Sequence, residues 1–336
     1  MERNIDRSII RGGWQLMPGH TLGRDGGDEL APILDAIDEG FRTFDCADIY
    51  GGVEEAFGRA SERAKADGIP IRVHTKFVPD RDRLGSIGQP YTQEIIDRSL
   101  RRLRTDRLDL VQFHWWDYAV PRYLEVLEYL FRLRRAGKIK AIGLTNCDGE
   151  HLREILDAGF DIASLQVQYS IIDRRCEATV LPLCAAKGIA VFTYGAILGG
   201  LLNEKWLNRP EPRMADLENR SLIKYKLIID DWGGWARFQS LLGQLDAIAR
   251  GRRCTISQVA IGSLLCATNI DAVIVGLSPR SYHAQNAELA NLVRLDEEEL
   301  RLAWSWECPL QGDVYHLERT SEKHSGIMRY NLNQAQ

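Results

Sequence analysis

Long hydrophobic runs are missing from this chain of 336 residues. Its apolar stretches, such as residues 190–192 and 272–275, are far too short to cross a bilayer. The first six residues are mostly charged or polar and lack an apolar signal core, so we do not expect secretion. A net charge of −4 gives no basic excess, which argues against nucleic-acid and membrane partners. We therefore expect a cytoplasmic protein.

Paired cysteines and phosphate-binding loops are also missing. The seven cysteines are scattered without Cys-x-x-Cys spacing, which favours reduced thiols over disulfides or zinc, and we expect no metal site. The Gly-Gly-Trp of residues 12–14 is not the G-x-G-x-x-G of a dinucleotide-binding turn, and no Walker motif occurs. What remains is an ordinary globular composition, with 45% hydrophobic and 27% charged residues.

Apolar strand-like segments alternate with amphipathic helical segments along most of the chain. The expected strands are residues 9–16, 41–44, 71–76, 108–113, 139–144, 163–167, 189–193 and 272–275. Strict alternation predicts parallel strands joined by right-handed crossovers, and eight such units favour a closed (β/α)8 TIM barrel. An open doubly wound sheet is the alternative, although it would normally carry the glycine-rich turn that is absent after the first strand.

Two segments depart from this rhythm. A long insertion after the seventh strand, residues 195–253, contains Trp232 and Trp235, which we interpret as the small core of the insertion. Residues 1–310 are expected to form one barrel domain, followed by a tail of residues 311–336. The sequence leaves open whether this tail folds back over the barrel mouth or frays. Helices are expected at residues 255–266 and 278–292.

Polar side chains stand where the expected strands end, which in a barrel is the active-site face. They are Asp45 and Tyr50 after the second strand, Lys76 after the third, His114 after the fourth, Thr145 and Asn146 after the fifth, Gln168 after the sixth and Tyr194 after the seventh. Although tens of residues apart in sequence, they are expected to converge on one mouth.

Four of these residues fit a site for proton transfer to a carbonyl. A phenol titrates near pH 10, and a neighbouring ammonium such as Lys76 would lower the pKa of Tyr50 toward the working range. A buried Lys76 needs a carboxylate partner, which Asp45 can provide. His114 could then orient a carbonyl oxygen by hydrogen bonding. The alternative of a glycosidase pair formed by Asp45 and Asp48 would leave the Lys and the Tyr without a role.

Residues 40–51, GFRTFDCADIYG, resemble the aldo-keto reductase pattern G-x-R-x-x-D-T-A-x-x-Y-G, with Cys46 in place of the usual Thr. Residues 99–110, followed by His114, are similar to the segment that leads to the catalytic His of that family. The resemblance covers about residues 5–300. It implies the catalytic set Asp45, Tyr50, Lys76 and His114, a hydride taken from a nicotinamide, and Tyr50 as the acid.

The same resemblance implies a cofactor site. Its residues would be Gly13, Asp45, Thr145, Asn146, Gln168, Tyr194, Gly195, Gly200, Gly276, Ser278, Arg280, Gln285 and Asn286. The family usually continues Ser-Pro-Leu after the stacking aromatic, whereas this chain has Gly-Ala-Ile at residues 195–197. Gly276 and Tyr282 stand where Lys and Arg usually grip the 2′-phosphate, so NADPH is expected with NADH possible, and Ser278 and Arg280 could substitute.

Substrate contacts are expected from Trp14, Tyr50, His114 and Trp115, while the adjacent Trp116 is expected either at the mouth or in the core. The expected function is an NAD(P)H-dependent reduction of a small aldehyde or ketone, or the reverse oxidation. A cofactor-binding redox sensor or regulatory subunit with little turnover is the alternative. Neither the identity of the carbonyl nor the oligomeric state follows from the sequence.

Overall fold

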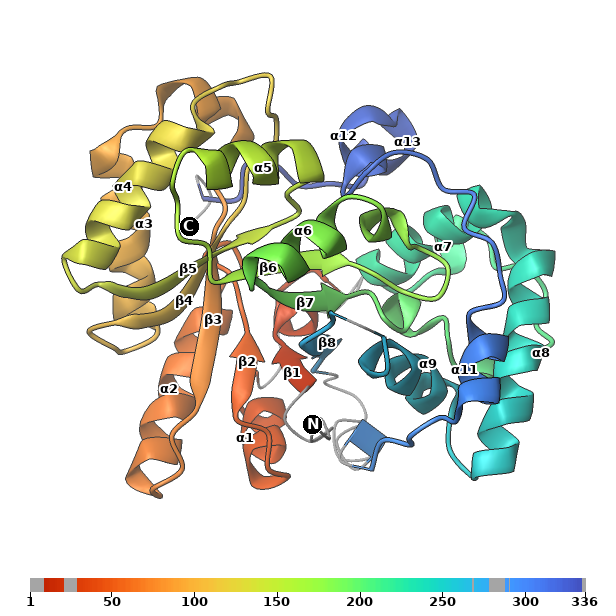
Figure 1. Cartoon of the computed structure of the whole chain (residues 1–336). Coiled ribbons are helices and arrows are strands. Elements are labelled where there is room, and N and C mark those ends of the chain that lie inside the picture. Colours follow the sequence, from red (N-terminus) through yellow and green to blue (C-terminus); the bar gives the residue numbers. More distant parts are fainter. Residues whose placement is uncertain (1–8, 21–28, 268, 278–287, 290, 334–336) are drawn as a thin grey trace.

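Eight parallel strands close into a barrel in the computed structural model, which describes residues 9–20, 29–267, 269–277, 288–289 and 291–333 (Figure 1). They are β1 (Ile9–Gly12), β2 (Thr43–Asp45), β3 (Arg72–Phe77), β4 (Leu108–Phe113), β5 (Ile139–Thr145), β6 (Ser164–Gln168), β7 (Ala190–Tyr194) and β8 (Ala272–Gly276). β1 pairs with both β2 and β8, which closes the ring. The predicted (β/α)8 barrel is confirmed, and the open sheet is excluded.

Helices from the crossovers surround the barrel. They are α1 (Leu30–Asp38), α2 (Val53–Ala66), α3 (Gln89–Arg102), α4 (Tyr123–Arg135), α5 (Gly149–Asp157) and α6 (Val180–Lys187). Each turns an apolar face to the strands, as α4 does with Val126, Leu127 and Leu130, all fully buried. α2 begins directly after Gly52, whose φ of 76° lies in the left-handed region that glycine tolerates. This sharp turn fixes the loop that carries Tyr50.

The insertion after β7 forms α7 (Arg220–Trp232) and α8 (Gly234–Arg252), which pack with α9 (Ile256–Leu265) and α11 (Glu297–Ala303). Trp232 and Trp235 are buried in a second apolar cluster formed largely by these helices, so their interpretation as a local core is confirmed. α9 starts with the predicted capping box of Thr255 and Gln258. The helix expected at residues 278–292 lies almost entirely outside the described residues.

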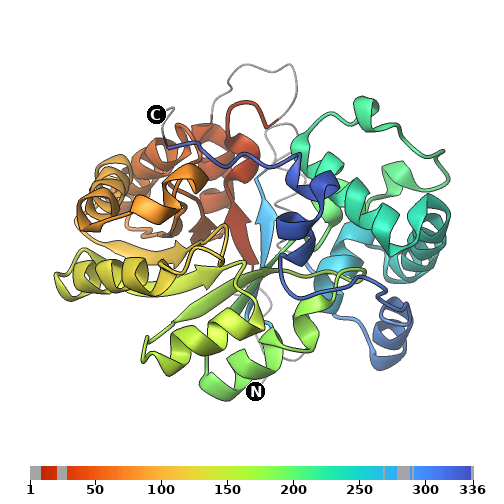
Figure 2. The same ribbon diagram turned by 90° about the horizontal axis from the view of Figure 1, so that it is seen from above.

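The tail returns to the barrel instead of fraying. After α11 the chain forms α12 (His316–Thr320) and α13 (Glu322–Ser325). Seen from above, these two blue helices and the following strand-like segment cross the barrel (Figure 2). Tail residues Tyr315, Met328 and Leu332 line the same cavity as Tyr50. Within the described residues, no helix is long and apolar enough to span a membrane.

Candidate active site

A buried ion pair forms the floor of the site. Lys76 Nζ on β3 donates to Asp45 Oδ1 on β2 at 2.6 Å and to the Cys46 carbonyl at 2.8 Å. The other carboxylate oxygen of Asp45 accepts hydrogen bonds from the side-chain amides of Gln112 at 2.9 Å and Gln166 at 2.7 Å. Three barrel side chains thus donate to the Asp45 carboxylate, and this network holds Lys76 in one position.

Tyr50 lies directly above this pair, at the mouth. The Lys76 ammonium lies 5.4 Å from the centre of the Tyr50 ring, and the ring packs against Trp14 with centroids 5.0 Å apart. Burial, reinforced by the Asp45 carboxylate, raises the pKa of Tyr50 well above its ordinary value. The expected lowering is therefore wrong for this arrangement, because burial and the Asp45 carboxylate favour the neutral phenol. The phenol is held in its protonated form.

His114 faces the cavity as a neutral imidazole. Burial, the nearby positive charge of Arg319 and that of Lys76 lower the pKa of His114 to about 3, against a smaller opposing effect of the Thr145 carbonyl. The Thr145 carbonyl lies 3.4 Å from Nδ1 and can only accept, so Nδ1 carries the proton. Nε2 is buried without a hydrogen-bond partner among the described residues and has a free lone pair. In this tautomer His114 accepts a hydrogen bond from a hydroxyl and cannot donate to a carbonyl, contrary to the expected role.

The cavity above these residues has a volume of about 530 Å³. Trp14, Tyr50 and His114 line it as expected, but Trp115 does not. Trp115 is fully buried in the core and donates its indole N–H to the Val120 carbonyl at 3.1 Å. Trp116 lines the cavity instead and packs edge-on against His114 with centroids 4.2 Å apart. The expectation for Trp115 is therefore wrong, and of the two places left open for Trp116 the structure shows the mouth.

One wall of the cavity is built by the ends of β5, β7 and β8. The expected residues found there are Thr145, Asn146, Tyr194, Gly195, Gly200 and Gly276. Tyr194 donates its hydroxyl to the Asn146 side-chain oxygen at 2.7 Å, so the aromatic ring and the amide are fixed relative to each other. Gly13 is not part of the lining; it follows β1 and donates its N–H to the Asp45 carbonyl at 2.8 Å, while its neighbour Gly12 lines the cavity.

Gln168 is not part of the cavity lining. Its amide donates to Asp173 Oδ2 at 2.5 Å, and the residue two positions earlier, Gln166, lines the cavity instead. Gln166 and Gln168 point to the same side of β6, since side chains two residues apart in a strand share a face. Which of the two lines the cavity therefore depends on its position along the strand. The remaining expected cofactor residues, Ser278, Arg280, Gln285 and Asn286, lie outside the described residues.

The wall formed by β7 and the following loop fits a flat ring joined to phosphates. Gly195 and Gly199 have no room for a side chain, because a Cβ would lie 2.6 Å from the Tyr225 hydroxyl and 2.9 Å from Ser221. Gly200, with φ of 101°, faces open space. Lys205 and Lys224 also line the cavity, and Lys224 is paired with the buried Glu318 at 3.5 Å. A nicotinamide ring stacked on Tyr194, with its phosphates near the lysines, fits these residues.

Gly276 has a different neighbour. The Gln15 side chain lies against it, and a Cβ at residue 276 would come within about 2.0 Å of the Gln15 amide. A longer residue that grips a phosphate from this position would therefore require Gln15 to move. The glycine at this position and the glutamine after β1 fit together as a pair.

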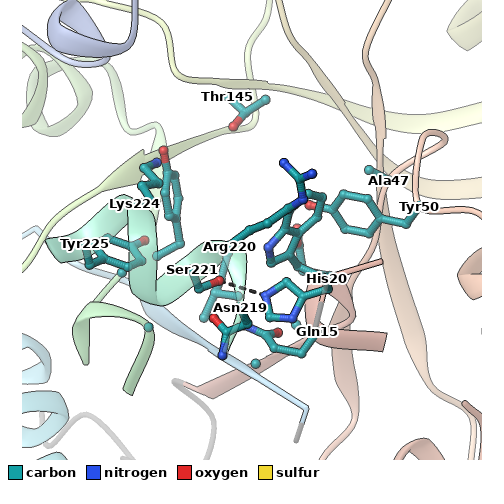
Figure 3. Close-up of a pocket in the computed structure, with 18 of the residues that line it drawn as sticks. Gln15, His20, Ala47, Tyr50, Thr145, Asn219, Arg220, Ser221, Lys224 and Tyr225 are labelled. Atoms are coloured by element: carbon teal, nitrogen blue, oxygen red, sulfur yellow. Dashed lines mark hydrogen bonds between the residues drawn. The ribbon is translucent and has the colours of Figure 1, made fainter. Parts of the chain in front are cut away.

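Several lining residues were not expected from the sequence. Tyr315 in the tail packs edge-on against His114, and Lys224 lies 5.1 Å from the centre of the Tyr194 ring. His20, after β1, lies 2.9 Å from the Ser221 hydroxyl at the start of α7 (Figure 3). All three come from loops or the insertion, where no periodic pattern links a residue to the mouth. In the sequence, only the basic and aromatic residues of the tail indicated that it could contribute to the cavity.

Comparison with known proteins gives a consistent result. Residues 8–303 match the profile described as the Aldo/keto reductase family. The chain is 30% identical over 247 residues to Aldo-keto reductase YhdN of Bacillus subtilis, covering 72% of each protein. It is 26% identical over 283 residues to the NADH-specific methylglyoxal reductase of Escherichia coli, covering 77% of this chain and 82% of that one.

A longer relative and solved structures extend the comparison. The Flagellar radial spoke protein 5 of Chlamydomonas reinhardtii is 29% identical over 240 residues, which span 60% of this chain but only 45% of that protein. The fold matches a glycerol dehydrogenase from Gluconobacter oxydans with a TM-score of 0.71 and 23% identity, covering 91% of this chain and 93% of that one. A thermostable aldo-keto reductase matches at a TM-score of 0.65 and 25% identity, covering 89% and 94%. The chain belongs to the aldo/keto reductase family.

Proposed function

We propose that this chain is an NAD(P)H-dependent reductase of an aldehyde or ketone, with Tyr50 as the proton donor. The observation that supports it most directly is the Lys76–Asp45 pair, 2.6 Å long and buried beneath the Tyr50 ring. A protein that only bound a nucleotide would have no use for a protonated phenol above a buried ammonium at the bottom of a cavity. The family membership and the Tyr194 wall support the cofactor.

The proton step follows from the positions of these groups. When bound, the nicotinamide supplies a hydride to the carbonyl carbon. Tyr50 gives its phenolic proton to the carbonyl oxygen as that oxygen gains negative charge, and the ammonium of Lys76 stabilises the phenolate left behind. His114, neutral and with a free Nε2, accepts a hydrogen bond from the hydroxyl of the alcohol. In the oxidation direction this contact would position the alcohol.

NADPH is the cofactor that we propose, with NADH possible, because Lys205 provides positive charge beside the glycine-rich loop after β7, where Lys224 is already paired with Glu318. The substrate would be a small carbonyl compound, since the cavity is about 530 Å³ and must also hold the nicotinamide. A cytoplasmic location is part of the same proposal and agrees with seven free cysteines.

A screen with both cofactors tests this proposal. Aldehydes, ketones, keto-sugars and quinones would be offered with NADPH and NADH in parallel, and oxidation would be followed at the nicotinamide absorbance. We expect cofactor-dependent turnover of at least one class. Tight nucleotide binding without turnover across the whole panel would instead favour the alternative of a redox-sensing or regulatory subunit.

A further inference from the structure

Two arginines meet at the rim of the cavity on the side of Trp14 and His20. Arg220 is the first residue of α7, and Arg329 follows α13 in the tail. Both line the cavity that holds Tyr50. In Figure 3 the side chain of Arg220 extends from α7 into the space between Lys224 and Tyr50. Segments more than 100 residues apart thus bring two guanidinium groups to one opening.

Few hydrogen bonds join these guanidinium groups to other described residues, and Arg220 is half-buried whereas Arg329 is exposed. Arg220 Nη1 donates to the Ile327 carbonyl at 3.3 Å, whereas Arg220 Nε is buried without a hydrogen-bond partner. The guanidinium of Arg329 lies beside Gly19, with its terminal nitrogens 3.9 Å from where a Cβ would be. No carboxylate in the described part of the chain forms an ion pair with either arginine, although Glu218 lines the same cavity.

Placing two like charges together without a counter-ion is unfavourable. Burial and then the charge of Arg329 lower the pKa of Arg220 below its ordinary value. The same cationic rim also affects His20, whose pKa falls to about 4 through burial and the charge of Arg220. An anion that enters the cavity would stabilise the two guanidinium groups. The planar fork of arginine matches carboxylate and phosphate oxygens.

The position of the arginines separates them from the cofactor wall. Lys224 lies one turn after Arg220 on α7 and contacts the rings of Tyr194 and Tyr225, at 5.1 and 5.6 Å from their centres. Arg220 instead adjoins His20 through its main-chain N–H, which donates to the His20 carbonyl at 3.2 Å. His20 in turn packs edge-on against Trp14, which contacts Tyr50. Lys224 thus adjoins Tyr194 on the proposed cofactor side, while Arg220 begins α7 next to His20 and Arg329 lies beside Gly19.

We propose that Arg220 and Arg329 bind an anionic group of the substrate, so that the preferred substrates are aldehydes or ketones that also carry a carboxylate. The inference rests on the reductase function proposed above and specifies its substrate class. The carbonyl would reach Tyr50 while the carboxylate lies at the arginine rim, with Trp14 packing against the part between them.

A matched pair of substrates tests this inference. 4-Carboxybenzaldehyde and its methyl ester present the same aldehyde with and without a negative charge. We expect the wild type to favour the acid in kcat/KM by about 10-fold or more, as for a charge-assisted hydrogen bond. Arg220→Gln and Arg329→Gln should each reduce the acid-to-ester ratio several-fold. Arg301→Gln, an exposed arginine on α11 paired with Glu298, is the control and should keep the wild-type ratio.

Two further measurements separate the possible failures. The Kd of NADPH, followed by tryptophan fluorescence, should stay within about two-fold in both variants. A large rise in Kd with equal losses for acid and ester would mean that the arginines hold a cofactor phosphate, and would overturn the inference. An ester preferred by an active wild type would also overturn it while leaving the reductase function intact.

A binding measurement with a compound that cannot react provides a second, independent test. Terephthalate, which has no aldehyde, would be titrated by calorimetry into the wild type and Arg220→Gln with NADP⁺ present. We expect binding to the wild type and a loss of about 10-fold or more in the variant. If terephthalate binds in this way but no carbonyl is turned over, the anion site stands and the proposed reductase function fails. Equal binding to both proteins would contradict the site.

Discussion

At the scale of single residues, the pairing of Asp45 with Lys76 explains both stability and chemistry. Both side chains are about 7% exposed, so neither charge can be solvated if the other is removed. Gln112 and Gln166 complete the hydrogen bonds of the carboxylate. The pair thus places a fixed positive charge below Tyr50 that a surface lysine could not provide.

Asp45→Asn should therefore be strongly destabilising. The substitution keeps the shape of the side chain but leaves the Lys76 ammonium buried without a carboxylate, a loss of about 3–5 kcal/mol in unfolding free energy. Urea unfolding followed by circular dichroism would measure it. Glu128→Gln is a matched control, because Glu128 pairs with Arg132 and Arg135 on the exposed face of α4 and should cost less than about 1 kcal/mol. Equal losses in the two variants would contradict a buried, functional ion pair.

His74 provides a separate test of burial. Its ring stacks on Phe192 at 5.5 Å, and burial lowers the pKa of His74 to about 4. Between pH 6.5 and 4 the unfolded chain binds a proton at this position that the folded chain does not, so stability falls as the pH falls through that window.

His74→Phe should remove this contribution. The slope of unfolding free energy against pH between 4.5 and 6 should decrease by one proton, about 1.4 kcal/mol per pH unit. Urea unfolding at several pH values would measure it in both proteins. Buried Asp48 and Glu54, with raised pKa values, act in the opposite direction but do so in both proteins and cancel in the difference. An unchanged slope would show that His74 titrates normally in the folded state.

Residue-level details were the hardest to predict. The sequence correctly placed Asp45, Lys76, Tyr50 and His114 at strand ends, because the barrel brings all strand ends to one face. It could not distinguish Trp115 from Trp116, since the loop after β4 decides which indole turns inward. The protonation of Tyr50 and His114 was also inaccessible, because it depends on burial by the distant tail.

At the scale of elements, Arg319 is one of several residues that attach the tail to the barrel, and it reaches the loops beside His114. Arg319 on α12 donates to the main-chain carbonyls of Asn146 at 2.8 Å, Trp115 at 3.2 Å and Trp116 at 3.3 Å. These carbonyls belong to the loops after β4 and β5, which carry His114 and the Asn146 amide. Arg319 is therefore a positioning residue that links the tail to both loops.

Arg319→Met should loosen this link. We expect kcat/KM to fall by about 10- to 100-fold, as small displacements of reacting groups do, and the tail to be cut faster in limited proteolysis. Losing the positive charge should also raise the pKa of His114, so the acid limb of the pH–rate profile should move to higher pH. Lys323→Gln, which removes the exposed pair with Asp231 on the neighbouring helix, is the control. An unshifted acid limb would limit Arg319 to a structural role.

Most elements followed from periodicity. The eight strands were expected within a few residues and their alternation with helices was expected too, because each element must bury one face against the barrel. The role of α7 was not expected, because an amphipathic helix in an insertion shows which face is apolar but not which cavity its polar face reaches. The direction of the tail was left open for the same reason.

At the scale of the whole molecule, the closed barrel unites these parts. Its strand ends provide the fixed Asp45–Lys76 pair, while the insertion and the tail close the cavity from two other directions. Rigid strands thus hold the groups that transfer the proton, and loops hold the groups that select the ligand. The arrangement allows the substrate side to vary without disturbing the chemistry.

The central claim, that Tyr50 donates the proton, is tested most directly by Tyr50→Phe. The measurement is kcat for an active carbonyl substrate together with the Kd of NADPH, in the wild type and in the variant. The account predicts that kcat falls by about 10²- to 10⁴-fold while the Kd stays within a few-fold, because only the phenolic hydroxyl is lost. A variant that retains the wild-type kcat would contradict it.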